Sequence, residues 1–248
     1  MANENIFTTK ADEYAKSRPS YSQKAIEKIF EEMIHPGETA ADIGSGTGIL
    51  SNEFLSRGYD VFCVEPNEAM RTEAEKKYEK NEHFHSINAP AENTGLPENS
   101  ISLITAASAF HWFDPKAFKE ECKRILRPRG IVCILFNERS YDDFTKKQHE
   151  ICSKYCKDFT SLSHGAKKTY DRADILFEKR YKLESFDFNL SYTKESFISR
   201  SLSSSYAPEK GTEAYEKYTA ALKALLDAKF SDDRIEIANS TVMLSGMV

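Results

Sequence analysis

The sequence predicts an α/β fold in which helices cover both faces of a parallel sheet. Strand-like and helix-like segments alternate over residues 1–137. Each strand-like segment is a continuous apolar run, such as the run from Ile131 to Phe136. Such runs are typical of parallel strands, because these are buried on both faces. A glycine-rich loop also follows the first strand directly and begins a helix, which is typical of nucleotide-binding sheets.

Apolar spacing and helix caps define the predicted elements of residues 1–137. Apolar residues at helical spacing follow the cap residue Ser22, until Pro36-Gly37 ends the first helix. Asn67 caps a helix that runs to about residue 80, and Asp114, followed by proline, begins another. The remaining predictions are strands over 39–43, 61–64, 84–88, 101–107 and 131–136, a helical pattern over 50–58 and a polar loop over 89–100.

The last third of the chain has a different pattern. Apolar and polar residues alternate over 185–192, which predicts a half-exposed antiparallel strand. The other predictions are a helix over 141–156, a loop over 160–168, helices over 193–202 and 212–230, and a strand over 235–244. No Pro-, Gly- or Ser-rich linker and no repeat interrupts the chain. We therefore expect a single domain over 1–248, with a core at 1–137 and late strands and cover helices at 138–248.

Composition and charge narrow the classes of function. The net charge of −5 argues against a broad basic surface for nucleic acid. The apolar runs are too short to cross a bilayer, and the first residues lack the regions of a signal peptide. The five cysteines are odd in number and form no Cys-x-x-Cys, so we expect reduced core thiols. These features predict a cytoplasmic protein without a nucleic-acid or membrane partner, and they leave its oligomeric state open.

The glycine loop and an acidic residue form an adenosine-binding layout. The first strand leads into the loop from Gly44 to Gly48, where missing Cβ atoms let a ligand approach the backbone. Glu65 follows the second strand, and a carboxylate there can accept hydrogen bonds from two ribose hydroxyls. A dinucleotide fingerprint needs glycine or alanine where Ile49 stands, and a phosphate loop needs a lysine that does not follow Gly48. We therefore expect an adenosine ligand that lacks a pyrophosphate.

Several motifs of the chain resemble those of class I S-adenosylmethionine-dependent methyltransferases. The segment Ala41–Gly48, which reads ADIGSGTG, resembles motif I of that family, and Glu65 fits the family's acidic position. Three further motifs stand at the family's positions, namely Ala89–Glu92, Ala109–Asp114 and Leu126–Gly130. The resemblance implies a Rossmann-like, doubly wound, mostly parallel seven-stranded sheet with an antiparallel edge strand. It also implies a helical cover from the C-terminal third and S-adenosylmethionine as cofactor of the core at 1–137.

Two further segments narrow the resemblance to one branch. The opening from Ala11 to Pro19 is typical of the methyltransferase type 11 branch, which acts on small molecules. The His-Trp-Phe-Asp segment and the region from Phe197 to Tyr206 resemble relatives of trans-aconitate methyltransferase.

The resemblance also implies cofactor-binding roles, residue by residue. The backbone of Gly44, Ser45 and Gly46 would contact the amino-acid part of the cofactor, with Asp42 orienting the loop or the ammonium group. Glu65 would hold the ribose. The residues expected near the adenine are Asn67, Met70, Ala91 and Glu92. Ala107 and Ser108 would line the channel to the methyl group. Tyr14 and Arg18 belong to an N-terminal arm that would close the pocket.

Candidate acceptor-binding residues lie at the active edge of the sheet and in the late cover. They are Tyr21, His111, Trp112, Arg200 and Tyr206, and His111 is also the candidate catalytic residue. Because guanidinium groups pair with carboxylates in a bidentate geometry, Arg18 and Arg200 predict a small carboxylic acid as substrate. No metal site is expected, since three potential ligands on one helix face (His149, Cys152 and Cys156) lack a fourth partner. One alternative is an NAD-dependent oxidoreductase, which the glycine spacing disfavours. A second is a non-catalytic module that binds S-adenosylmethionine. A third is an RNA or protein methyltransferase, which the acidic charge disfavours.

Overall fold

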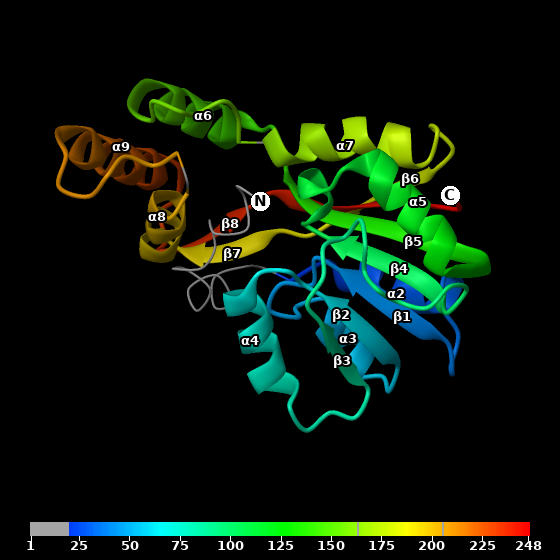
Figure 1. The fold of residues 1–248 in the computed structure, drawn as a ribbon. Helices are drawn as coiled ribbons and strands as arrows, with labels where there is room; N and C mark the ends of the chain where they lie inside the picture. The colour runs from blue at the N-terminus through cyan, green and yellow to red at the C-terminus, as the bar shows by residue number, and fades with distance from the viewer. Residues whose placement is uncertain (1–19, 163, 205) are drawn as a thin grey trace. The chain divides into compact units, whose positions relative to one another are not determined.

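The core of the fold is a seven-stranded sheet (Figure 1). The computed structural model describes residues 20–162, 164–204 and 206–248. The strands of the sheet are β1 (Thr39–Ile43), β2 (Asp60–Val64), β3 (Phe84–Ile87), β4 (Ile101–Ala107), β5 (Leu126–Arg139), β6 (Lys182–Asp187) and β9 (Asn239–Gly246). Their order is β3-β2-β1-β4-β5-β9-β6, and the first five are joined by parallel pairings.

The far edge of this sheet is antiparallel. The amide of Phe188, which follows β6, donates to the carbonyl of Asn239, the first residue of β9, over 2.8 Å. Since the end of β6 meets the beginning of β9, the edge strand β6 runs antiparallel to β9. The predicted fold class, a mostly parallel seven-stranded sheet with an antiparallel edge strand, is thereby confirmed.

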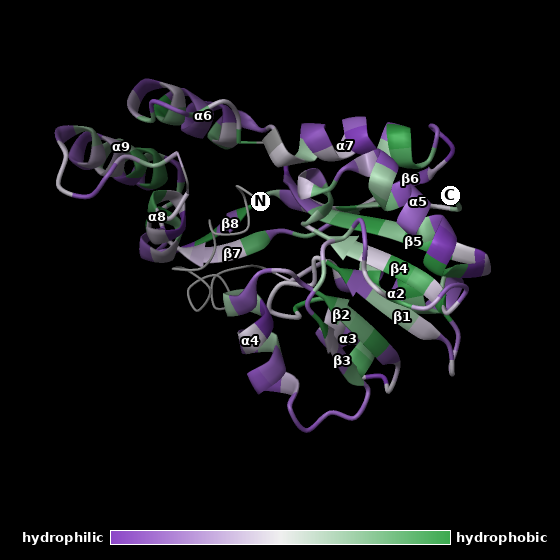
Figure 2. Cartoon of the chain, in the orientation of Figure 1, coloured by the Kyte–Doolittle hydropathy of each residue, from purple (hydrophilic) through white to green (hydrophobic). Residues whose placement is uncertain are grey.

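Helices cover both faces of the sheet, because alternate residues of each strand face opposite ways. One face packs against α2 (Gln23–Glu32), α3 (Ser51–Leu55) and α4 (Glu68–Tyr78). The other packs against the short 3-10 helix η1 (Phe110–Trp112), α5 (Pro115–Ile125) and α7 (His164–Leu176). Figure 2 shows β4 and β5 as mostly hydrophobic, whereas α5 and α7 mix hydrophobic and hydrophilic residues. The strands are therefore buried on both faces, as their continuous apolar runs predict.

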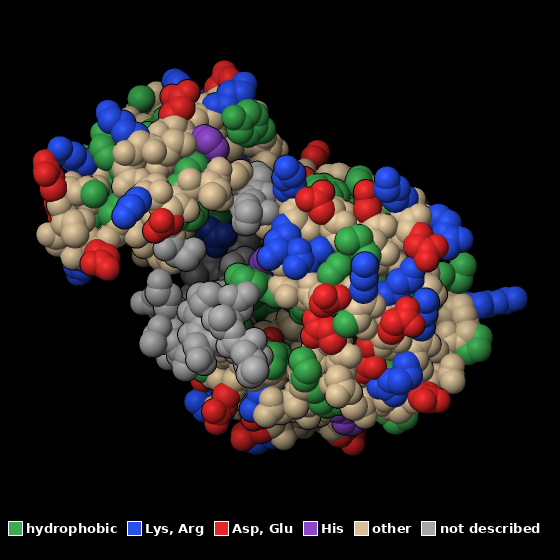
Figure 3. Space-filling view, turned by 45° about the horizontal axis from the view of Figure 1, so that its top comes forward, with side chains coloured by type: hydrophobic (Ala, Val, Ile, Leu, Met, Phe, Trp, Pro, Cys, Tyr) green, Lys and Arg blue, Asp and Glu red, His purple; other side chains and the backbone are tan. Residues whose placement is uncertain are grey.

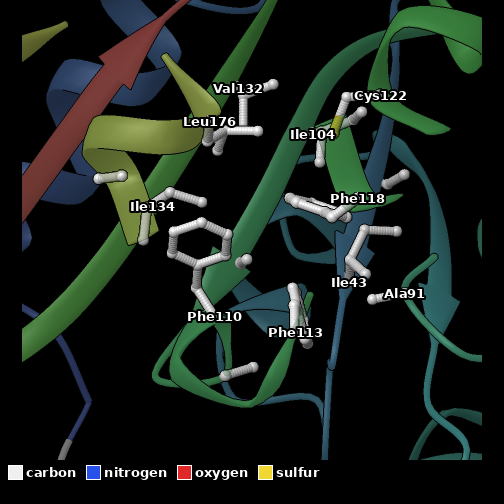
Figure 4. Close-up of a cluster of buried hydrophobic side chains, with 14 of the residues drawn as sticks. Ile43, Ala91, Ile104, Phe110, Phe113, Phe118, Cys122, Val132, Ile134 and Leu176 are labelled. Carbon is white, nitrogen blue, oxygen red and sulfur yellow. The ribbon is translucent and has the colours of Figure 1, made fainter. Parts of the chain in front are cut away.

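Aromatic side chains fill the second of these interfaces (Figure 4). The ring of Phe118 on α5 is fully buried and lies 5.8 Å from the ring of Phe110 and 5.0 Å from that of Phe113, measured between centroids. Because both of these phenylalanines flank or belong to η1, their packing holds this short helix beside the end of β4.

Two of the three predicted helix caps form capping hydrogen bonds in the structure. The side chain of Asp114 accepts hydrogen bonds from the amides that begin α5, and Asn67 caps α4 in the same way. Ser22 occupies the cap position of α2, but its side chain makes no capping hydrogen bond. Its amide instead donates to Oγ1 of Thr241 on β9 over 2.8 Å, so the start of α2 is held by a tertiary contact.

Three predicted elements differ from the observed ones. Residues 164–168, expected in a loop, begin α7, whose Ala173 and Leu176 are buried against the sheet. The strand expected over 185–192 is two strands, because β6 pairs in the large sheet and β7 (Leu190–Thr193) pairs with β8 (Arg234–Ile237) in a separate two-stranded sheet. The strand expected over 235–244 is divided between β8 and β9 for the same reason.

The chain is divided into two compact units. Unit 1 comprises residues 1–137, 165–186 and 241–248, and unit 2 comprises residues 138–164 and 187–240. The sequence-based boundary at 137 coincides with the end of the first segment of unit 1. Unit 1 also takes up α7, β6 and most of β9, which the sequence analysis assigned to the last third. The description of the chain as one domain stays a prediction.

Unit 2 is a helical unit with a core of its own. It contains the two-stranded sheet together with α6 (Asp143–Tyr155), α8 (Lys194–Leu202) and α9 (Glu213–Lys229). Its two apolar clusters centre on Phe144 and Phe197 and on Tyr218 and Leu222, all of them buried. The predicted late helices are therefore confirmed as elements and form a unit with its own apolar interior.

The state of the cysteines and the distribution of surface charge agree with what the sequence predicts. All five cysteines are free and buried, as predicted. On the face seen in Figure 3, basic and acidic side chains are interspersed. In the part of the chain that the structure describes, no helix is long and apolar enough to cross a membrane.

Candidate active site

The glycine loop after β1 is closely packed against two neighbouring segments. Gly44 has a φ of +68°, and a Cβ at this position would lie 2.5 Å from the Cβ of Ala109. Gly48 has a φ of +76°, and a Cβ there would lie 2.6 Å from the ring of Tyr78. The amides of Gly44 and Ser45 both donate to the last carbonyl of β2, over 2.8 and 3.2 Å. The loop therefore requires glycine at both positions, because of its backbone conformation and its close neighbours.

Glu65, directly after β2, turns its carboxylate towards this loop. Its Oε2 accepts a hydrogen bond from the amide of Gly46 over 2.9 Å, and its Oε1 accepts one from the amide of Asn67 over 2.8 Å. The residue is 8% exposed, and burial raises the pKa of its carboxyl group. Since a carboxylate offers about four acceptor positions, both oxygens can still accept a hydrogen bond from a ligand. The acid is thus held rigidly beside the loop.

Asn67 and Met70 lie beside the same carboxylate at the start of α4. The Asn67 side chain accepts a hydrogen bond from the amide of Met70 over 3.0 Å. Met70 is buried, and its sulfur lies 3.6 Å from the position that a Cβ on Gly46 would take. The structure therefore brings the two residues expected near the adenine together with Gly46 and Glu65.

Asp42 is buried beneath the loop. Its two carboxylate oxygens accept hydrogen bonds from Oγ of Ser51 over 2.7 Å and from Oγ1 of Thr105 over 3.0 Å. These contacts tie the end of β1 to the start of α3 and to β4, which fits a residue that orients the loop. With only 1% of its surface exposed, Asp42 has no observed path to a ligand's ammonium group. Burial raises the pKa of this carboxyl group from 3.8 to about 6.

The elevated pKa of Asp42 predicts a pH dependence of stability. Between about pH 4 and 6 the folded state binds more protons than the unfolded state, so the free energy of unfolding should fall as the pH rises through this range. The expected loss is roughly 3 kcal/mol, with no further change above the folded pKa. Because Asp42→Asn cannot ionise, its stability relative to the wild type should rise by about this amount from pH 4 to pH 6.5.

Urea unfolding at several pH values tests this expectation. The variant Asp232→Asn, which changes an exposed aspartate, serves as the control and should show a constant difference from the wild type. A constant difference for Asp42→Asn as well would show that Asp42 ionises as easily in the folded chain as in the unfolded one.

The segment after β3 contributes Ala91 and Glu92. Ala91 is buried in the same apolar cluster as Val64, the last residue of β2. Oε1 of Glu92 accepts a hydrogen bond from the amide of Asp114 over 2.7 Å. Glu92 therefore links its loop to the start of α5, a contact that the sequence analysis did not foresee, and its expected role at the adenine edge stays a prediction.

Ala107 ends β4, and Ser108 follows it in a strained conformation. Ser108 has a φ of +54°, which residues other than glycine rarely adopt, and such outliers concentrate at functional sites. Its amide donates to the carbonyl of Leu135 over 2.7 Å, and its Oγ accepts a hydrogen bond from the hydroxyl of Tyr21 over 3.0 Å. The structure thus brings Tyr21, a predicted acceptor contact, next to a residue predicted to line the methyl channel.

His111 and Trp112 lie on η1, directly after this strained turn. Their rings are 4.9 Å apart between centroids, and Trp112 is 41% exposed. Nζ of Lys168 lies 5.6 Å from the centre of the Trp112 ring, a cation–π contact. Sequence reasoning missed Lys168 because it expected a loop at the start of α7. The four-residue spacing of Lys168 and Arg172, which places both on one helix face, was the available signal.

The remaining predicted site residues lie elsewhere or outside the described residues. Tyr14 and Arg18 lie outside them. Arg200 and Tyr206 belong to unit 2, where the guanidinium carbon of Arg200 is 5.8 Å from the centre of the Tyr192 ring. Burial raises the pKa of the Tyr206 hydroxyl.

Among the described residues, no group of three or more His, Cys, Asp and Glu side chains could hold a metal ion. The ring of His149 packs 5.0 Å from that of Phe159, and the sulfur of Cys152 lies 3.5 Å from the hydroxyl of Tyr218. The side chains on this face of α6 therefore pack within unit 2.

Comparison with protein families explains the arrangement of loop, acid and strand end. Residues 41–134, which run from motif I to the middle of β5, match the family of methyltransferase domains of type 11. This stretch of the chain is a type 11 methyltransferase domain. The methyltransferase domain contains Gly44, Glu65, Ser108 and His111, whereas Tyr21 and Lys168, which contact Ser108 and Trp112, lie outside the matched range.

Curated relatives are also described as methyltransferases. An uncharacterized methyltransferase of Mycobacterium tuberculosis is 31% identical over 126 residues, which are 51% of this chain and 49% of the relative. An uncharacterized methyltransferase of Oceanobacillus iheyensis is 26% identical over 189 residues, covering 75% of this chain and 83% of the relative. The chain thus spans about half the length of the first curated relatives that it matches.

Solved structures share the fold of the methyltransferase domain and of the rest of the chain. A proposed type II methyltransferase of Anaeromyxobacter dehalogenans superposes with a TM-score of 0.66 at 20% identity, covering 93% of this chain and 97% of that one. Phosphoethanolamine N-methyltransferase 2 of Haemonchus contortus, in complex with phosphomonomethylethanolamine and S-adenosylhomocysteine, has a TM-score of 0.54 at 17% identity, covering 99% of this chain and 58% of that one. At these identities the likeness concerns the fold.

Proposed function

We propose that this protein transfers the methyl group of S-adenosylmethionine to a small-molecule acceptor. The observation that carries the proposal is the position of the Glu65 carboxylate directly after β2. Its Oε2 atom lies 2.9 Å from the amide nitrogen of Gly46. An acid at this place, beside a glycine loop that begins a helix, provides for a ribose and for the amino-acid part of the cofactor. The methyltransferase domain match and the cofactor-bound structural neighbours support the same ligand.

The residues present fit S-adenosylmethionine. Both oxygens of Glu65 retain acceptor capacity for the ribose hydroxyls, and Met70 offers an apolar side chain beside Gly46 for the adenine. The loop has Ile49 where a dinucleotide fingerprint needs glycine or alanine, which favours this cofactor over NAD. When bound, S-adenosylmethionine supplies a methyl group that is activated for displacement by the positive charge on sulfur.

The protein's own contribution is positioning. Holding an acceptor atom in line with the reacting bond can contribute roughly 7–11 kcal/mol towards the barrier. Ser108, fixed by Leu135 and Tyr21 in a strained conformation, and His111 on η1 would set the acceptor's orientation. His111 would remove a proton where the acceptor is an alcohol or an amine, and a carboxylate acceptor would need no such base.

The acceptor in this proposal is a small carboxylic acid. Arg200 and Tyr206 are the described candidates for recognising it within unit 2, since guanidinium groups orient carboxylates through paired hydrogen bonds. Activity separates this proposal from a non-catalytic module. Incubation with a metabolite extract and the cofactor carrying a labelled methyl group should yield a labelled carboxylic acid or its ester.

The cofactor assignment predicts a ligand-dependent stabilisation. At a hundredfold excess over Kd, S-adenosylhomocysteine should raise the unfolding free energy by about 2.7 kcal/mol. For a chain of this length that corresponds to a rise in Tm of about 5–10 °C, whereas NAD at equal concentration should leave Tm unchanged. A thermal melt with each ligand measures both values, and stabilisation by NAD alone would contradict the assignment.

A further inference from the structure

Arg139, the last residue of β5, is a partly buried cation that lacks a counter-ion in the described part of the chain. One of its N–H groups donates to Oε1 of Gln148, a buried amide on α6. No carboxylate of the described residues forms an ion pair with it. Asp142 contributes a favourable charge but uses its side chain to cap α6, accepting the amide of Thr145 over 2.8 Å. Several N–H donors of the guanidinium group are therefore still available.

Aromatic side chains of unit 2 surround this cation. Its guanidinium carbon lies 5.5 Å from the centre of the Phe197 ring, which is itself buried. The Tyr192 ring packs against the same Phe197 ring, with 5.8 Å between the centroids, and burial lowers the pKa of Arg139. The hydroxyl of Tyr192 is buried and, among the described residues, makes no hydrogen bond. A second guanidinium group, that of Arg200, lies against the Tyr192 ring.

The Arg139 guanidinium group and the buried Tyr192 hydroxyl each lower the stability of the fold unless a ligand bonds to them. A buried hydroxyl without a partner costs about 1–3 kcal/mol. A cation removed from water also loses hydration that only a counter-ion or further hydrogen bonds can replace. One anionic group satisfies both at once, because its oxygens accept from the guanidinium N–H groups and from the hydroxyl. A carboxylate has the planar, two-oxygen shape that matches a guanidinium group.

We propose that Arg139 and Tyr192 form a carboxylate-binding site in unit 2. The contacts that carry this inference are all made by residues of unit 2, so it goes beyond the proposed function and stands apart from it. Arg139 is at the carboxyl end of β5, and ligands of open α/β sheets bind beyond the carboxyl ends of the strands. The sequence analysis named Arg18 and Arg200, together with His111 and Tyr206, for binding a carboxylate, whereas this proposal gives the leading role to Arg139.

The test measures binding of carboxylate probes to the full chain, saturated with S-adenosylhomocysteine, by calorimetry. The probes are succinate, propane-1,2,3-tricarboxylate and the uncharged trimethyl ester of the latter. At least one of the acids should bind the wild type tenfold or more tightly than the ester. Arg139→Gln and Arg139→Lys should each weaken that acid at least tenfold, because one loses the charge and the other loses the paired donors.

Two further variants make the test specific. Arg234→Gln removes an exposed arginine of the same unit and should leave binding unchanged. Tyr192→Phe removes a hydroxyl that bonds to none of the described residues, so it should fold normally, yet weaken the acid several-fold. Equal binding of the acids and the ester, or unchanged binding in Arg139→Gln and Tyr192→Phe, would overturn the proposal. Failure of the cofactor assignment would be seen separately, as absence of S-adenosylhomocysteine binding in the wild type.

Discussion

Replacing Gly44 with alanine is expected to destabilise the protein and to weaken cofactor binding together. The added Cβ would stand 2.5 Å from that of Ala109, a short side chain that cannot turn away. The φ of +68° adds the cost of a left-handed conformation, about 1–2 kcal/mol, to an overpacking cost of about 1–3 kcal/mol. Since relief of the clash would displace the loop whose Gly46 amide bonds to Glu65, we expect S-adenosylhomocysteine to bind Gly44→Ala at least tenfold more weakly.

Gly37→Ala is the matched control for this change. Gly37 has a φ of +84°, but no atom lies within 4 Å of the position of its missing Cβ. Its substitution therefore incurs the conformational cost alone and leaves the loop in place. Urea unfolding and calorimetry should separate the two variants clearly. Equal destabilisation and unchanged cofactor affinity for Gly44→Ala would mean that the loop adapts to a side chain.

Glu65→Gln is expected to lower cofactor affinity at least tenfold with the fold intact. The amide keeps the size of the acid but retains only one acceptor oxygen, and its NH₂ group would face a backbone N–H. Hydrogen bonds from two ribose hydroxyls to a charged acceptor would be weakened, and such bonds contribute about 1.5–3 kcal/mol each. Titration calorimetry with S-adenosylhomocysteine measures the loss.

The control for Glu65→Gln is Glu68→Gln, an exposed position at the start of α4 that has the same charge change. Its cofactor affinity should equal that of the wild type. If Glu65→Gln also bound normally, the acid would act only as a support for the amides of Gly46 and Asn67, and the ribose would have to be held elsewhere.

Much of the core could be predicted because its signals are local. Continuous apolar runs, helix caps and glycines at fixed spacing act over a few residues. The structure confirms the apolar strands, the caps at Asp114 and Asn67, and the glycine loop. Where a segment's structure depends on its partner, the same reasoning was wrong. The alternating run over 185–192 satisfies one strand pattern, but β6 and β7 pair in two different sheets. The alternation of apolar and polar residues does not indicate which strand pairs with this segment.

The site shows the same division between local and tertiary information. The sequence by itself determined the order of strand, glycine loop, helix and acid, and thereby the methyltransferase motifs and the position of Glu65. Only the tertiary structure decided that Glu65 binds the Gly46 amide and that Ser108 is strained and bonded to Tyr21. It also decided that Arg139 forms no ion pair with any described residue. The physical reason is that hydrogen bonds, burial and charge pairing join residues far apart in the chain, whereas periodicity and capping act between neighbours.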